Sequence, residues 1–288
     1  MDKDVTAAVT MMQREMRVRD GAVAVGLGEN PVERGRYSIS SDEFLMHLSG
    51  GTRMYYRKGE GVTIDRMPGE DPRDIDLFLN GSVYAAAACI NGLYPMHASA
   101  VAVNGHVHAF TGPSGAGKST LIAELGRRGF PMFCDDTMLI DMSRPDQLIC
   151  LPGHKRLKLT PDALAMTGAT AQEQVASMID KRFAEPAAGV HASPLPLAGL
   201  MFLEEGDPAR IEPMPGGERI LRLQDDHYTT EFFEFVHRPN RAERFRQLAR
   251  LAQGISISRF VRPRDSRRFA DDAAIVAEHL QSASGNLP

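Results

Sequence analysis

The sequence predicts an α/β fold with a small β-rich lobe at its N-terminal end. An apolar run at 99–110 leads into a glycine-rich loop and then an apolar-periodic helix, a strand–loop–helix order typical of α/β proteins. Residues 21–70 instead carry short β-type runs separated by turn residues. The length of 288 residues fits one large domain or one domain with a smaller partner. We therefore assign 1–72 to the lobe and 73–288 to the main domain.

The elements of the lobe and of the first helix after it follow from periodicity. Residues 1–20 predict a helix, because apolar side chains recur there at helical spacing. The runs 53–58 and 62–66 flank a glycine-containing turn and predict a β-hairpin. Residues 74–92 predict a helix with an apolar stripe, and Asp74 is its expected N-cap. The lobe should end in the Pro/Gly-rich stretch before this helix.

The main domain should hold a sheet flanked by helices. Asn104-Gly105 separates two apolar runs and predicts a tight hairpin. The C-terminal part, residues 229–280, is mostly helical by pattern. Further strands are expected at 131–136, 137–142, 148–153, 156–159, 198–205 and 254–261.

The composition disfavours several classes of protein. Apolar residues make up 43%, charged residues 24%, and the net charge is −4, so the chain can bury a core and is not of the disordered type. The mild acidity disfavours nucleic-acid binding through bulk positive charge. Three cysteines without metal-ligand spacing, no secretion signal and no 18-residue apolar run predict a cytoplasmic protein without a membrane partner.

The most informative motif is GPSGAGKS at 112–119, which matches G-x-x-x-x-G-K-[ST]. Glycines let backbone N–H groups surround phosphate oxygens, and the following helix adds its positive N-terminal end. Lys118 would reach the β- and γ-phosphates, and Ser119 would place a hydroxyl on Mg²⁺. The positions expected to bind nucleotide are Gly112, Pro113, Ser114, Gly115, Ala116, Gly117, Lys118, Ser119 and Thr120. The alternative is a glycine-rich turn without a ligand.

An acidic pair, Asp135-Asp136, follows a short apolar run. Two neighbouring carboxylates allow Asp135 to hold the metal while Asp136 accepts a proton from an attacking hydroxyl. Neighbours in an extended chain face opposite ways, so both can serve only where the chain turns. A solvated Asx turn is the alternative. His97, just before the first predicted strand, is either catalytic or structural.

Basic residues at 154–158 form the candidate substrate contact. Lys155, Arg156 and Lys158 could neutralise phosphate or bind an acceptor carboxylate. If this stretch is a strand, Lys155 faces away from the other two. The alternative is an exposed edge strand guarded by positive charge.

Three other polar runs are interpreted as solvent-facing structure. Lys181-Arg182 is interpreted as a solvated helix end, although a second substrate contact stays open. Asp225-Asp226-His227 is interpreted as a loop. The run VRPRDSRR at 261–268 is interpreted as a solvated basic face, with an anion or peptide site as its alternative.

Taken in chain order, His97, the run 99–110, the loop 112–119 and Asp135-Asp136 resemble the HPr kinase/phosphorylase family. The loop with HASAV upstream and CDDT downstream is especially similar to the shorter bacterial HPr-kinase-like proteins. The resemblance is strong over about 95–160 and weaker elsewhere. The glycine-rich segment that the full-length enzymes carry after the double Asp is missing at 152–164, so the resemblance implies neither phosphorolysis nor HPr as the substrate.

The resemblance implies a P-loop kinase domain with a fold similar to phosphoenolpyruvate carboxykinase, using ATP and Mg²⁺. Asp135 would be metal-associated, Asp136 would be the base toward a serine hydroxyl, and His97 would lie near the transferring phosphate. Short relatives often accompany peptide-modification systems, including lasso-peptide pathways, which implies a precursor-peptide serine as acceptor.

The sequence therefore predicts an ATP-dependent serine kinase with a peptide or protein substrate. Two alternatives stay open: a small-molecule kinase with the same site, and a nucleotide-responsive binding protein that transfers nothing. A homo-oligomer is compatible with either.

Overall fold

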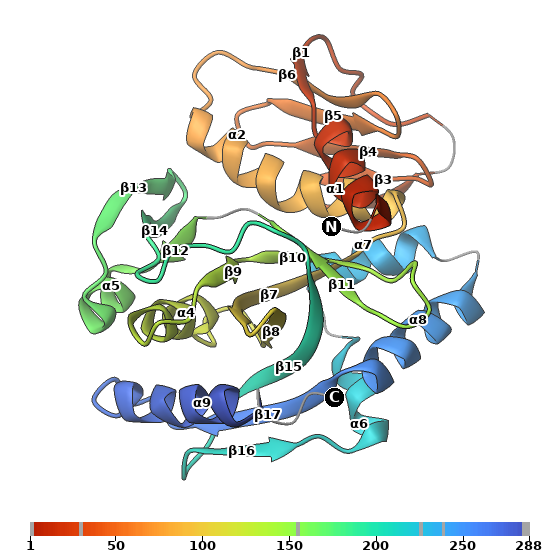
Figure 1. Ribbon diagram of the computed structural model, residues 1–288. Coiled ribbons are helices and arrows are strands. Elements are labelled where there is room, and N and C mark those ends of the chain that lie inside the picture. The colour runs from red at the N-terminus through yellow and green to blue at the C-terminus, as the bar shows by residue number, and fades with distance from the viewer. Residues whose placement is uncertain (1–2, 29–30, 154–155, 225–226, 238–239, 284–288) are drawn as a thin grey trace.

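The computed structural model describes residues 3–28, 31–153, 156–224, 227–237 and 240–283 (Figure 1). Its N-terminal part is a helix and a six-stranded sheet of order β1-β6-β5-β4-β3-β2, in which β1 runs parallel to β6 and the other pairs are antiparallel. The bounds are α1 Lys3–Glu15, β1 Val18–Asp20, β2 Val32–Arg34, β3 Tyr37–Ile39, β4 Glu43–His47, β5 Arg53–Arg57 and β6 Gly61–Asp65.

Two predictions for this part have different outcomes. The hairpin expected from 53–58 and 62–66 is confirmed as β5 and β6. The helix expected over 1–20 is too long, because it ends at Glu15 and Val18–Asp20 forms β1 instead. Backbone pairing with β6, a contact distant in sequence, satisfies those three residues in place of helical bonds.

The helix expected over 74–92 is present as three joined segments: α2 Pro72–Phe78, the π-helical segment η1 Leu79–Val83, and α3 Tyr84–Ile90. Its N-cap is Asp71, not Asp74, because the Asp71 carboxylate accepts from the Arg73 backbone N at 2.9 Å. Pro72 then takes the first helical position, which suits proline because no N–H is needed there. Asp74 is released from capping and is buried.

The main sheet has the order β11-β10-β7-β8-β15-β17-β16, with β9 paired to β7. β15 runs parallel to both β8 and β17, which makes the centre of the sheet parallel. Its strands are β7 Tyr94–Val103, β8 His106–Thr111, β9 Met132–Cys134, β10 Thr137–Asp141, β11 Ile149–Leu151, β15 Leu195–Glu205, β16 Arg210–Pro213 and β17 Ser256–Arg262.

A third, three-stranded sheet of order β12-β14-β13 lies at one side of the molecule with helix α5 (Figure 1). Its elements are β12 Leu157–Leu159, α5 Pro161–Thr167, β13 Ala171–Ala176 and β14 Ile179–Ala184. The remaining helices are α4 Lys118–Arg127, α6 Gly216–Arg222, α7 Tyr228–Val236, α8 Arg241–Gly254 and α9 Phe269–Ala283. The chain is thus a mixed α/β protein with several sheets, as the sequence predicts.

Most predicted elements of the main domain are confirmed. Asn104 and Gly105 both have positive φ, 47° and 78°, as a two-residue hairpin turn between β7 and β8 requires. The helical C-terminal part with one strand is present. One prediction is wrong: His97 lies inside β7 and not before it, because pairing with β10 extends the strand back to Tyr94. The strands β13 and β14 were not predicted, since AQEQVA is polar.

The core crosses the predicted boundary between lobe and main domain. One hydrophobic cluster joins Phe44 of β4 to residues of α3, β10 and α7. The rings of Phe44 and Phe232 lie 5.3 Å apart between centroids, in an edge contact. The division into 1–72 and 73–288 stays a prediction. In the part of the chain that the structure describes, no helix is long and apolar enough to cross a membrane.

Candidate active site

One cavity of about 420 Å³ brings most of the predicted site residues together. It is bordered by β7, the turn between β9 and β10, the start of α4, the small sheet and the N-terminus of α7. Its lining residues are His97, Ser99, Ser114, Gly115, Gly117, Lys118, Ser119, Thr120, Asp135, Asp136, Lys158, Thr160, Lys181 and His227. Gly112, Pro113 and Ala116 of the predicted nucleotide-binding set are not part of this lining.

The glycine-rich loop depends on its glycines for geometric reasons. Gly112, Gly115 and Gly117 have φ of 145°, 81° and 88°, values that side chains disfavour. A Cβ on Gly112 would lie 3.0 Å from the Leu203 carbonyl oxygen, and one on Gly117 would lie 2.5 Å from a guanidinium nitrogen of Arg262. The motif spacing therefore matches a loop packed tightly against β15 and β17.

Lys118 is held inside this loop. Its ammonium donates to the Gly112 carbonyl at 2.8 Å and to the Pro113 carbonyl at 3.2 Å, and the residue is only 7% exposed. Two carbonyls that do not line the cavity thus hold the lysine in place. Because the ammonium has three donors, Lys118 can replace its bonds to these carbonyls with bonds to anionic oxygens.

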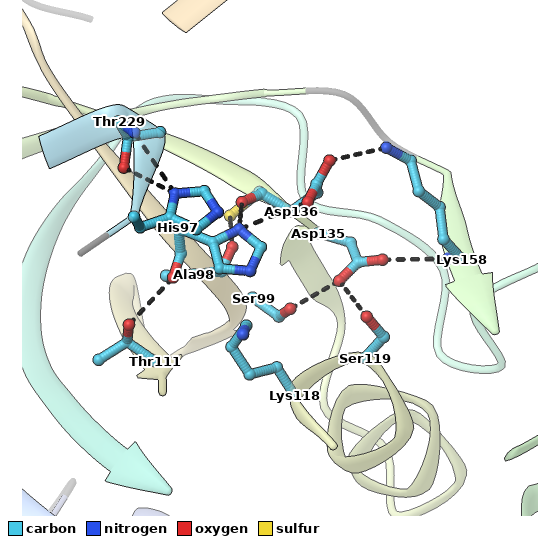
Figure 2. Close-up of polar contacts among 12 residues, drawn as sticks. His97, Ala98, Ser99, Thr111, Lys118, Ser119, Asp135, Asp136, Lys158 and Thr229 are labelled. Carbon is cyan, nitrogen blue, oxygen red and sulfur yellow. Dashed lines mark hydrogen bonds and ion pairs between the residues drawn. The ribbon is translucent and has the colours of Figure 1, made fainter. Parts of the chain in front are cut away.

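Asp135 is buried and is a hydrogen-bond centre (Figure 2). One carboxylate oxygen accepts from Ser99 Oγ at 2.6 Å and from Ser119 Oγ at 2.8 Å. The other oxygen accepts from the Lys158 backbone N at 3.0 Å. Ser99 was missed in the sequence, although its place two residues after His97 on one strand puts both on the same face.

Asp136 occupies the turn between β9 and β10 with φ of 79°, so the condition that the chain must turn at the acidic pair is met. Its carboxylate accepts from the Lys158 ammonium at 2.8 Å. Burial raises the pKa of Asp136, but the charges of Lys158 and then His97 lower it to about 2. The carboxylate is therefore ionised at neutral pH.

His97 donates through Nδ1 to the Asp136 carbonyl at 2.9 Å (Figure 2). Burial and the charge of Lys118 lower the pKa of His97 to about 4, against the opposing effect of Asp136. The imidazole is therefore neutral at pH 7. Because Nδ1 carries the proton, Nε2 is the acceptor nitrogen of the ring.

His227 lines the cavity and stacks on His97, with ring centroids 3.8 Å apart and planes at 9°. It precedes α7, and its Nδ1 accepts from the Thr229 backbone N at 3.4 Å. The interpretation of 225–227 as a loop missed this role, because no local pattern indicates a partner 130 residues away. Asp225 and Asp226 lie outside the described residues.

Lys181 is the third lysine in the lining, and it lies on strand β14 instead of at the helix end that the sequence suggested. Its charge lowers the pKa of both His97 and Asp136, so its electrostatic effect reaches the two predicted catalytic side chains. No hydrogen bond or ion pair joins its ammonium to any other residue that the structure describes. The sequence has six lysines, and three of those that the structure describes line this cavity.

The predicted substrate contacts separate in the structure. Lys158 faces the cavity, whereas Arg156 pairs with Glu173 and its guanidinium lies over the Phe183 ring at 3.4 Å. The expectation that Arg156 and Lys158 share a face assumed a strand through both residues, but β12 begins only at Leu157. Arg156 nevertheless stacks on Phe183, which lies opposite Lys158 on β14. Lys155 lies outside the described residues. Contact of any of the three with a substrate stays a prediction.

The basic run after β17 is not a plain solvated face. Arg262 donates to the Ala116 carbonyl at 3.0 Å, and Arg264 donates to the Gly115 carbonyl at 2.8 Å. Both arginines therefore hold the outer side of the glycine-rich loop. A separation of almost 150 residues explains why the sequence gives no sign of it.

The oxygen atoms of Ser119 and Asp135 are hard donors of the kind that Mg²⁺ takes. Among the described residues, no group of three or more His, Cys, Asp or Glu side chains could hold a metal ion. Mg²⁺ in phosphoryl-transfer sites commonly uses one or two protein ligands together with substrate phosphates. The residues present fit such a shared ion.

The comparisons with known proteins add little. No protein-family model matches the chain, and no curated protein sequence matches it. Among solved structures, the HPr(Ser) kinase/phosphatase from Coxiella burnetii is similar over 66% of this chain and 97% of that chain, with 15% sequence identity and a TM-score of 0.33. A similarity this low does not indicate the function of the chain.

Proposed function

We propose that the protein is an ATP-dependent kinase that transfers the γ-phosphate to a hydroxyl, with a serine of a peptide or protein as the acceptor. The observation that carries this proposal is the acidic turn. Asp135 is hydrogen-bonded to Ser119 at the start of α4, and Asp136 faces the same cavity beside His97. A site that only binds nucleotide has no need of the second carboxylate.

The glycine-rich loop holds the triphosphate in this proposal. The cavity volume lies within the range of about 300–1,000 Å³ usual for small-molecule sites. Lys118 exchanges its loop carbonyls for phosphate oxygens, and Ser119 with Asp135 holds Mg²⁺. The bound Mg²⁺ would supply charge neutralisation at the phosphates.

Asp136 accepts the proton of the acceptor hydroxyl. The hydroxyl oxygen forms a bond to the γ-phosphorus, the bond from that phosphorus to the bridging oxygen breaks, and ADP leaves with the electron pair. A base with a pKa near 2 is ionised in advance, although it draws the proton only late in the transfer. The charges of Lys158 and Lys181 oppose the negative charge at the transferred group.

A peptide serine is the favoured acceptor because the residues at 95–160 resemble short HPr-kinase-like proteins of peptide-modification systems. The three cysteines are all buried, and none forms a disulfide with another residue that the structure describes, which supports a reducing compartment such as the cytoplasm.

A transfer assay tests the proposal. The protein is incubated with Mg²⁺ and γ-labelled ATP against serine-containing peptides and, separately, a metabolite pool, with Asp136→Asn as the matched control. Label on a peptide serine that is lost in the control supports the proposal. Label on a small molecule would move the function to a metabolite kinase. Nucleotide binding without transfer to either set would indicate a nucleotide-responsive binding protein.

A further inference from the structure

The hairpin formed by β13 and β14 connects helix α2 to the cavity, because β13 contacts α2 and β14 carries Lys181 of the cavity lining. Its turn is held by Asp74, which is 4% exposed. One oxygen of this carboxylate accepts from the Ser177 backbone N at 2.7 Å, and the other accepts from the Ser177 hydroxyl. Both carboxylate oxygens of Asp74 therefore accept hydrogen bonds from a turn 103 residues away, and neither caps the N-terminus of its own helix.

The same hairpin carries Lys181, four residues beyond Ser177. Its strand β14 pairs with β12, where Phe183 lies opposite Lys158. Lys158 in turn is bound to both members of the acidic pair, through its backbone N to Asp135 and its ammonium to Asp136. The small sheet is thus tied to the acidic pair through β12 and to α2 through the hairpin turn, with Lys181 between these two attachments.

The hairpin has little internal means of holding this position. The pairing of β13 with β14 is interrupted by two register shifts, one on each side of Gln174. The first three residues of β13 are exposed. A short irregular ladder sets register weakly, so an outside contact at the turn has a large share in deciding where β14 lies.

We propose that Asp74 is a positioning residue for the active site: by holding the turn at Ser177 it places Lys181 in the cavity, where the ammonium binds a phosphate of the nucleotide. This inference rests on the proposed kinase function. It makes helix α2, whose Ile75 packs in the same core as the N-terminal sheet, part of the phosphate-binding structure. The two carboxylate bonds at the turn act only through the place they give to Lys181.

The test is a double-mutant cycle on nucleotide affinity and on the KM for ATP. Lys181→Ala should weaken ATP binding about tenfold, the value of a lost charge-assisted hydrogen bond. Asp74→Ala should also weaken ATP binding, and it should leave the glycine-rich loop itself unaffected. In the Lys181→Ala background, Asp74→Ala should have no further effect, because its only route to the nucleotide is already removed. Additive effects would overturn the inference.

The matched control is Asp76→Ala, which removes the same charge from an exposed place on the same helix. It should leave nucleotide affinity unchanged. A loss equal to that of Asp74→Ala would mean that helix charge, and not the turn contact, is responsible, and it would overturn the inference.

Ser177→Ala keeps the inference testable if Asp74→Ala fails to fold, since Ser177 is exposed and only one bond is lost. Hydrogen exchange at 171–184 should become faster while exchange in α4 stays the same, and ATP affinity should fall a few fold only when Lys181 is present. Unchanged affinity in Ser177→Ala and Lys181→Ala, with Lys118→Ala abolishing binding, would overturn the inference and leave the kinase proposal standing. Unchanged affinity in Lys118→Ala would overturn both.

Discussion

One part of the cavity lining, the first wall, comes from a continuous stretch of chain between His97 and Asp136. The other part, the second wall, comes from separate segments that carry Lys158, Lys181 and His227. The first wall is hydrogen-bonded within itself, with the buried Asp135 joined to two serine hydroxyls. The second wall supplies two lysines and a stacked histidine. In the proposed reaction the first wall would hold the reacting groups, and the second would set the charge around them.

The largest effect is expected on the first wall, from Lys118→Ala. Its ammonium is hydrogen-bonded to two carbonyls of the loop, and a preorganised charge at a transferring phosphoryl group is worth about 10²–10³ in rate. We expect transfer to fall by at least that factor and ATP affinity to fall with it. Label transfer and calorimetric titration with ATP measure the two. If this variant transferred label at the wild-type rate, the loop would not have the proposed phosphate-binding role.

Asp136→Asn should be the next largest. An amide keeps the shape of the turn but cannot accept the proton, and general-base catalysis contributes about 10²–10⁴ in rate. We expect transfer to fall within that range while ATP affinity is retained, measured by the same two assays. Full transfer by this variant would show that Asp136 is not the base.

Lys158→Met tests the comparison between the two walls, because it removes a charge from the second wall and changes the pKa of Asp136 in the first. The pKa of Asp136 is about 2 while Lys158 is present, so the ionised base is lost only as pH falls toward 2. Without that charge, burial raises the pKa, and the acid limb of the pH–rate profile should move upward by about one pH unit or more. A profile from pH 2 to 7 measures this. An unmoved acid limb would contradict the electrostatic link between the walls.

The smallest effects are expected outside the cavity, at the two arginines behind the loop. Arg262→Ala should raise the KM for ATP a few fold, because the loop loosens when the half-buried guanidinium that donates to the Ala116 carbonyl is lost. Hydrogen bonds from charged groups are worth about 1.5–3 kcal/mol, and solvent replaces part of this. Arg264→Ala is the matched comparison, and its exposed side chain should matter less. Steady-state kinetics distinguish them. A larger effect from Arg264 would reverse this order.

The first wall could be predicted because its residues carry local patterns. The spacing of the glycines, Lys118 and Ser119 follows from the geometry of one loop, and Asp135-Asp136 lies at one turn. The second wall could not. Lys181 stands on a polar strand with no apolar alternation, and His227 follows two acidic residues that resemble any surface loop. Asp74 was assigned to a local cap because helix starts favour acidic residues, but Asp71 caps and Asp74 bonds a distant turn.

By itself, the sequence determined the α/β class, most strands and helices, and the loop with its acidic pair, since these depend on periodicity and spacing within short stretches. Only the tertiary structure decided which distant side chains meet them: Lys158 at Asp136, His227 on His97, and the arginines behind the loop. Such pairs are separated by 22 to 149 residues, and no local backbone preference reports on them. They are set by how the sheets and helices pack.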